Sequence, residues 1–198
     1  QYSMARSKGS ELWPTLSDRC AIMGNEKKTV LELKNISKIY KTRGSFFGPG
    51  GEQVVALNRI SLAIYEGEIF GLVGESGSGK TTAGRLIVGL EHPKEGEITL
   101  NGTEATGLTG RALKEYRRKV QMIFQDPYQS LNPQLSIYES VAEPLLIHRM
   151  GDGAERLERV SKTLKTVGLS PPQEFLYRYP HQLSGGQRQR VAIARAMV

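Results

Sequence analysis

The stretch GESGSGKT at positions 74–81 matches the pattern G-x-x-x-x-G-K-[ST] at every fixed position. The run EIFGLV before it predicts a buried strand, and TTAGRLIVGL after it predicts a helix with one apolar face. Glycines let such a strand-to-helix loop wrap around phosphates so that successive N–H groups point at them. We predict that Lys80 reaches the β- and γ-phosphates of a nucleotide and that the Thr81 hydroxyl binds Mg²⁺. The expected nucleotide ligands in this loop are Gly74, Glu75, Ser76, Gly77, Ser78, Gly79, Lys80, Thr81 and Thr82.

A second candidate is Gln125, the last residue of KVQMIFQ, which we expect to be a strand. The strand should end there because Pro127 has no N–H to donate to a neighbour. Ligands of open α/β sheets bind beyond the carboxyl ends of the strands, where this amide would lie. A single glutamine in such a place is more often an ordinary surface residue, so its position alone does not assign it a function.

The third candidate is LSGGQRQRVAIARAMV, where a helix begins on two glycines. Ser184 and Gln187 have the S-x-x-Q spacing of a capping box. Gly185 and Gly186 lie inside that box, and each costs about 1 kcal/mol relative to alanine in a helix. Paired glycines at a capped helix start leave N–H groups open to an anion at the positive end of the helix dipole. We therefore predict a second phosphate-binding site here.

The overall composition is that of a soluble globular protein: 38% of the 198 residues are hydrophobic and 24% are charged. The 27 Lys and Arg exceed the 20 Asp and Glu, giving a net charge of +7, but the basic residues are scattered and favour no particular partner. No apolar run approaches the roughly 20 residues that cross a bilayer. A single cysteine and the lack of a signal peptide pattern favour a cytoplasmic setting.

The remaining sequence predicts strands first and helices second. Residues 29–36, 54–65 and 96–102 read as strands, with a long hairpin loop after Tyr40 and a turn at residues 66–67. Residues 136–150 read as a helix that Pro144 should bend or end, and residues 154–168 read as a helix with an apolar face. The apolar face of the second helix should consist of Ala154, Leu157, Val160, Leu164 and Val167. This order predicts an α/β fold with a parallel-sheet core and a helical insert.

A P-loop, a strand-ending glutamine and LSGGQ, in that order, resemble the nucleotide-binding domain of ABC transporters from about residue 29 to residue 198. The resemblance implies an α/β P-loop NTPase core with an antiparallel β subdomain and a helical subdomain. Residues 1–28 would be a leader, a linker or a disordered segment, and 29–198 a partial ABC ATPase domain. Within it, residues 29–125 would form the nucleotide-binding core with the β subdomain, 126–180 the helical subdomain, and 181–198 the signature and the start of its helix.

Roles follow from the resemblance one residue at a time. Tyr40 falls where the family stacks an aromatic ring on adenine, with packing on the core as the alternative. Gln125 matches the glutamine that contacts Mg²⁺ and the attacking water. The signature residues that would bind the γ-phosphate of an ATP held by a second domain are Ser184, Gly185, Gly186 and Gln187. The implied ligands are ATP and Mg²⁺, and two domains would pair head to tail, as a homodimer or a heterodimer.

The family's Walker B aspartate, catalytic glutamate and switch histidine come after the signature helix and have no counterpart among these residues. His181 precedes the signature, so a structural role is expected for it. The sequence therefore resembles a fragment of an ATP hydrolase, and the chain alone is expected to be inactive.

The stretches IFQDPYQSLNP, EPLLIH and RYPHQLSGGQRQR are most similar to ATP-binding subunits of oligopeptide and dipeptide importers. The partners implied are integral membrane permease subunits and, indirectly, an extracytoplasmic solute-binding protein, on the cytoplasmic face of the membrane, with no nucleic acid. Alternatives are an importer of nickel, glutathione or another small solute, or a soluble ABC ATPase acting on nucleic acid or ribosomes. An ordinary P-loop kinase or GTPase is disfavoured by LSGGQ.

Overall fold

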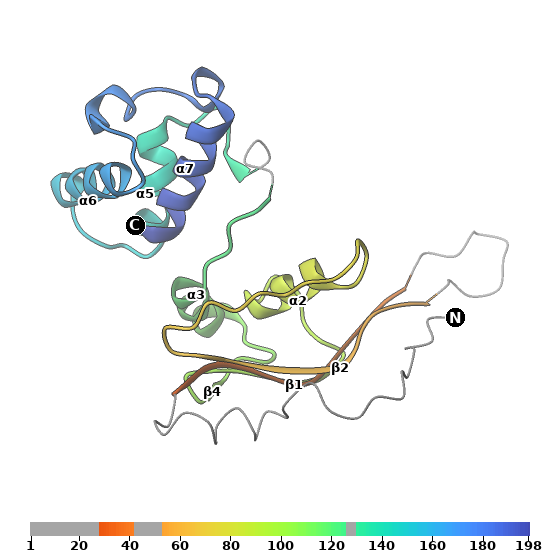
Figure 1. Ribbon diagram of the computed structural model, residues 1–198. Coiled ribbons are helices and arrows are strands. Elements are labelled where there is room, and N and C mark those ends of the chain that lie inside the picture. The colour runs from red at the N-terminus through yellow and green to blue at the C-terminus, as the bar shows by residue number, and fades with distance from the viewer. Residues whose placement is uncertain (1–27, 42–52, 126–129) are drawn as a thin grey trace, which may run out of the picture. The chain divides into compact units, whose positions relative to one another are not determined.

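The computed structural model describes residues 28–41, 53–125 and 130–198 (Figure 1). The predicted hairpin loop at 42–52 and nearly all of the predicted leader therefore lie outside the described residues. The chain divides into two compact units. The first comprises Gln1–Ala83 and His92–Gly107, and the second comprises Gly84–Glu91 and Leu108–Val198. The subdomain boundaries expected from the sequence, at residues 125 and 180, remain predictions.

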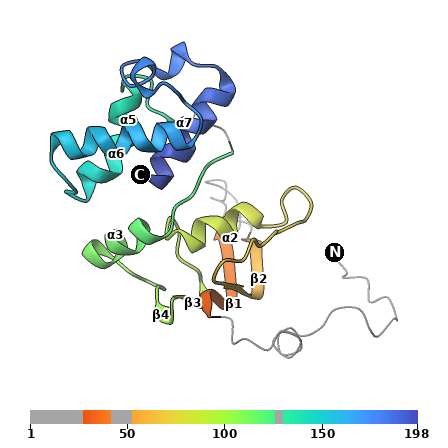
Figure 2. The same ribbon diagram turned by 60° about the vertical axis from the view of Figure 1, so that its left-hand side comes forward.

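The first unit contains a four-stranded antiparallel sheet in the order β2-β1-β3-β4 (Figure 2). Its strands are β1 (Thr29–Lys41), β2 (Gln53–Tyr65), β3 (Glu95–Leu100) and β4 (Thr103–Glu104). Alternate residues of β1 are buried, including Leu31 and Leu33, which is the period-2 pattern of a strand with one covered face. Gly67, with φ of 72°, allows the turn after β2. The predicted antiparallel subdomain is thus confirmed.

Two strands expected from the sequence are not formed. Residues 68–73 and 119–125 are strongly apolar, but neither segment pairs with a strand among the described residues. Ile69 is 100% exposed and Val73 is 94% exposed. A strand requires a neighbour to accept and donate its backbone hydrogen bonds, and apolar composition alone supplies none. The two predicted strands, and with them a parallel sheet, are therefore absent among the described residues.

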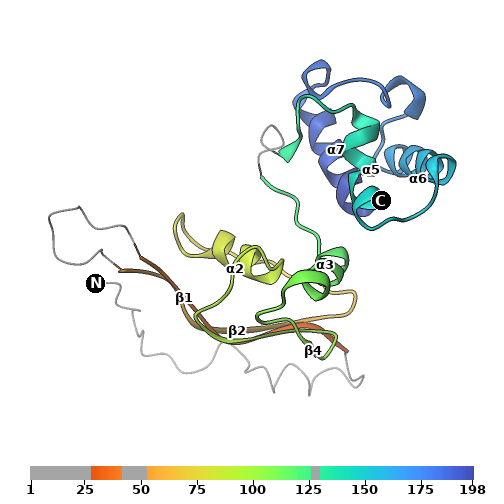
Figure 3. The ribbon, with the colours of Figure 1, turned by 180° about the vertical axis from the view of Figure 1, so that it is seen from behind.

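Helices form most of the second unit. They are α3 (Gly110–Lys119), α5 (Ile137–Ile147), α6 (Gly153–Thr166) and α7 (Gly185–Met197), while α2 (Lys80–Ile87) runs across the boundary between the units. Helices α5, α6 and α7 lie side by side (Figure 3) and share one hydrophobic core. Ile137, Val141, Val160, Leu164 and Val191 are each 0% exposed in it. None of the described helices is long and apolar enough to span a membrane.

The predicted helices are present, with two corrections. Helix α5 begins at the capping box of Ser136 and Glu139, as expected, but continues past Pro144 to Ile147. Proline removes one N–H, yet the Pro144 carbonyl still accepts from His148 N at 3.0 Å, so the helix continues for another turn. In α6, Val160 and Leu164 are buried as predicted, whereas Leu157 is 39% exposed. Ala154 is exposed as well, so the apolar face is shorter than expected.

Candidate phosphate-binding sites

The P-loop folds around the ammonium group of Lys80, the first residue of α2. Lys80 Nζ donates to Gly74 O at 2.7 Å, to Glu75 O at 2.6 Å and to Ser78 Oγ at 3.1 Å. A lysine ammonium has three protons, so these bonds account for all of them. Residues 74–78 are exposed. The loop thus holds a positive charge at its centre and remains accessible from solvent, which suits the binding of a phosphate chain.

Gly79 fixes the loop against the sheet. Its φ is +88°, and a Cβ at this position would lie 2.5 Å from Ala56 O and 2.6 Å from Leu57 Cδ2, both in β2. No side chain fits at those distances without a shift of the β2 backbone. Gly77 also has a positive φ, +83°, but nothing lies within 4 Å of its Cβ position. Gly79 is therefore required by packing and conformation together, whereas Gly77 is required by conformation alone.

Tyr40 lies near the end of β1, opposite Val54 of β2, and is half-buried. Lys38 Nζ lies 5.3 Å from the centroid of the Tyr40 ring, within the range of a cation–π contact. Lys38 also donates to His92 O at 2.8 Å. Tyr40 and the P-loop belong to the same unit, but the stacking of adenine on this ring stays a prediction.

Gln125 is exposed and belongs to the second unit, whereas Lys80 and Thr81 belong to the first. Its role beside a nucleotide held by the P-loop therefore stays a prediction. Thr81 is exposed on the first turn of α2, and Thr82 beside it is half-buried. The described residues contain no group of three or more His, Cys, Asp and Glu side chains that could hold a metal ion. The binding of Mg²⁺ by the oxygens of Thr81 and Gln125, together with the phosphates, stays a prediction.

The signature begins α7 with the predicted capping box. Ser184 N donates to Gln187 Oε1 at 2.9 Å, and Gln187 N donates to Ser184 Oγ at 3.3 Å. Gly185 and Gly186 are exposed, neither has a positive φ, and nothing lies within 4 Å of either Cβ position. Alanine would fit at both positions within the described part of the chain. Neither packing nor conformation within the described residues explains these glycines.

The capping box of α7 differs in charge from those of α5 and α6. Its third helical residue is the neutral Gln187, whereas α5 has Glu139 and α6 has Glu155 at the equivalent place. Hydrogen bonds from Ser136 keep the pKa of the Glu139 carboxyl below its ordinary value, so this cap is an anion at neutral pH. The first turn of α7 carries no acidic residue. Its helix dipole is therefore not neutralised by an adjacent carboxylate.

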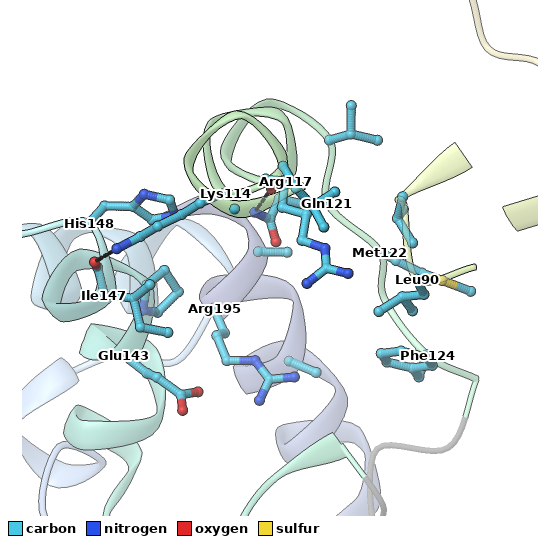
Figure 4. A pocket seen from close by; sticks show the side chains of 17 residues that line it. Leu90, Lys114, Arg117, Gln121, Met122, Phe124, Glu143, Ile147, His148 and Arg195 are labelled. Atoms are coloured by element: carbon cyan, nitrogen blue, oxygen red, sulfur yellow. Dashed lines mark hydrogen bonds between the residues drawn. The ribbon is translucent and has the colours of Figure 1, made fainter. Parts of the chain in front are cut away.

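Near Gln125, the second unit has a cleft of about 440 Å³ (Figure 4). Leu90, Met122, Phe124 and Ile147 contribute much of its apolar lining. Lys114 Nζ donates across one side to Ile147 O, as the dashed line in Figure 4 shows.

No sequence pattern pointed to three residues that shape the two sites. Ala56 and Leu57 of β2 limit the position of Gly79 through a backbone oxygen and a side-chain methyl group. Neither contact needs a particular residue type, so no motif marks these positions. Arg188 is buried behind the signature, and no feature of its local sequence indicated that burial. His181, for which a structural role was expected, stacks on Tyr179 with ring centroids 5.8 Å apart.

Comparison with known proteins identifies the family. The family model described as "ABC transporter" matches residues 57–198. The chain therefore belongs to the ABC transporter family. It is 45% identical over 176 residues to the oligopeptide transport ATP-binding protein OppF of Streptococcus mutans, which covers 88% of this chain and 54% of that protein. It is 42% identical over 172 residues to the glutathione import ATP-binding protein GsiA of Salmonella paratyphi A, covering 87% of this chain and 27% of that protein.

A solved structure of the same kind is the dimeric ATP-binding cassette MJ0796 in a post-hydrolysis state bound to ADP and Pi. It is 39% identical, with a TM-score of 0.73, and the match covers 84% of this chain and 68% of that chain. The predicted resemblance to an ABC ATPase fold is thus confirmed. The chain spans about half the length of the curated oligopeptide transport relatives that it matches.

Replacing Gly79 by alanine should destabilise the protein more than replacing Gly77. Both changes place a Cβ on a residue with positive φ, which costs about 1–2 kcal/mol. Gly79→Ala should cost about 1–3 kcal/mol more, because its Cβ collides with β2. Denaturant unfolding of the two variants and the wild type measures the difference. Equal free energies of unfolding for Gly77→Ala and Gly79→Ala would show that the close approach to β2 does not fix the loop.

Proposed function

We propose that the full-length protein is an ATP-binding subunit that couples ATP binding and hydrolysis to the import of oligopeptides or dipeptides through separate membrane permease subunits. The support is the pair of anion-receptive backbone segments, one wrapped around Lys80 and one at the start of α7. Each suits a phosphate, and the signature glycines have no role within the described chain. A protein that bound nucleotide with its P-loop alone would not need them.

In this proposal the P-loop binds the phosphates of ATP. Lys80 exchanges its bonds to Gly74 O and Glu75 O for bonds to the β- and γ-phosphates. The ring of Tyr40 packs on adenine, while Thr81 and Gln125 supply oxygen ligands to Mg²⁺. Hard cations of this size prefer such oxygen donors and complete their shell with phosphate oxygens and water.

The signature of each domain meets the nucleotide of the other. Ser184 Oγ and the N–H groups of Gly185 and Gly186 donate to the γ-phosphate across a head-to-tail dimer, and Gln187 keeps the cap closed. Because Gln187 is neutral, the phosphate meets no repulsive carboxylate at this helix start. The dimeric cassette among the solved relatives is consistent with such pairing.

The finer identity of the solute and partners rests on the relatives. Both OppF proteins and AppF are named for oligopeptide transport, and GsiA is named for glutathione import, which makes short peptides the preferred solute class. We place the protein on the cytoplasmic face of the membrane, where residues 126–180 dock on the permease. A solute-binding protein would act through that permease, and no nucleic acid would be involved.

The first test of this function is nucleotide binding by the P-loop. Lys80→Ala should weaken the binding of a fluorescent ATP analogue by about 1.5–3 kcal/mol, because a charge-assisted hydrogen bond to phosphate is lost. The matched control is Lys34→Ala, which removes an equally cationic but exposed side chain of β1 whose partner is Glu32. Unchanged binding by Lys80→Ala would remove the basis for the assigned site.

The second test adds a charge to the signature without breaking its cap. In Gln187→Glu the carboxylate should accept from Ser184 N as the amide oxygen does, so the thermal unfolding midpoint should hold or rise. A negative charge beside the incoming γ-phosphate should nevertheless weaken ATP-driven dimerisation about tenfold or more. Sedimentation of the full-length protein with MgATP measures this. The control Glu155→Gln alters an equivalent cap on α6 and should leave dimerisation unchanged. If Gln187→Glu dimerised at the same ATP concentration as the wild type, the assignment of the signature as a phosphate site would be contradicted.

A further inference from the structure

Behind the signature lies a buried charge. Among the residues that the structure describes, the buried polar side chains belong to three serines and to Arg188, which is 8% exposed. Arg188 is the fourth residue of α7, one turn after Ser184. Arg190, two residues further along α7, is exposed. Arg190 Nη1 donates to Gly168 O, just after α6, at 3.1 Å.

Arg188 reaches back to the residues that lead into the signature. Its Nη1 donates to Pro180 O at 3.0 Å, and its backbone N donates to Ser184 O at 3.0 Å. Pro180 O also accepts from Leu183 N at 3.2 Å. Leu183 is buried in the helical core, whereas Ser184 beside it is exposed. One side chain thus joins the helix to the start of the bend that presents Ser184, Gly185 and Gly186.

Stability alone does not account for an arginine at this place. Removing a guanidinium from water costs several kcal/mol, and replacing buried charged groups by apolar residues of similar volume is often neutral or stabilising. Arg188 donates to Pro180 O, the carbonyl that also accepts from Leu183 N immediately before the signature. We therefore look for the reason for Arg188 in the backbone geometry that its hydrogen bond to Pro180 O holds in place.

We propose that Arg188 is a positioning residue for the trans-acting phosphate site: it holds the bend at Pro180 so that Ser184 Oγ and the glycine N–H groups point at the partner's γ-phosphate. This rests on the proposed function of the signature. Glycines have no side chains to restrict them, so the direction of their N–H groups depends on the anchoring at both ends of the bend. Arg188 supplies that anchor from the buried side, where it does not obstruct the approaching nucleotide.

The proposal is tested in the full-length protein with three variants. Arg188→Met removes the bond to Pro180 O and leaves an apolar side chain in the same place. Arg188→Lys retains a cation that can donate to Pro180 O. Arg190→Met removes a neighbouring guanidinium from the same helix without touching Pro180. The measurements are the thermal unfolding midpoint, the affinity of the P-loop for MgATP in the monomer, and kcat and KM for ATP.

We expect Arg188→Met to keep the unfolding midpoint and monomer affinity of the wild type while its kcat falls about tenfold to a hundredfold, since small misplacements cost that much. Arg188→Lys should recover part of kcat, and Arg190→Met should keep it. The proposal is overturned if Arg188→Met turns over ATP at the wild-type rate. It is also overturned if the unfolding midpoint of Arg188→Met is lowered and the loss of folded protein accounts for the whole fall in kcat. Lys80→Ala is measured alongside, to distinguish failure of the Arg188 proposal from failure of the proposed function. Turnover of ATP by Lys80→Ala at the wild-type rate would contradict the proposed function itself.

Discussion

The close approach of Gly79 to β2 is the contact on which the nucleotide site depends. A Cβ at this position would lie 2.5 Å from Ala56 O, so the P-loop lies against the antiparallel sheet with no room for a side chain. The sheet has the strand order β2-β1-β3-β4, so its edge strand β2 provides a fixed edge for the loop. With the loop held there, Lys80 can gather three oxygens of the loop around its ammonium group. A positive charge is thereby held in place before any phosphate arrives, which reduces the ordering that binding would require.

The two glycine-rich segments use glycine for different reasons. In the P-loop the reasons are internal, since Gly79 and Gly77 have positive φ and Gly79 has no space for a Cβ. In the signature, Gly185 and Gly186 have ordinary helical neighbours and open space around them. Glycine is costly in a helix and nothing inside the described chain requires it here, which is why we propose that a ligand approaches these residues closely. Gln187 is neutral where α5 and α6 carry glutamates, which suits the anion that we propose as this ligand.

Local signals were read from the sequence more accurately than long-range ones. The P-loop, the turn at Gly67 and the capping boxes of Ser136 and Ser184 each depend on residues within a few positions, and each is present in the structure. The strands expected at residues 68–73 and 119–125 are absent, because a strand depends on a partner that its own sequence does not contain. The burial of Arg188 could not be predicted for the same reason: it follows from the packing of α7 with Pro180 and the helical core.

The head-to-tail use of the two phosphate sites is tested most directly by distributing substitutions across a dimer of full-length domains. Lys80→Ala damages the P-loop, and Ser184→Phe blocks the signature. If each site combines the P-loop of one domain with the signature of the other, a dimer with Lys80→Ala in one domain and the signature change in its partner keeps one intact site. We then expect one tightly held ATP per dimer. Placing both changes in one domain, opposite an unaltered partner, should leave none. The reverse result, with ATP held only when both changes share a domain, would contradict the trans arrangement.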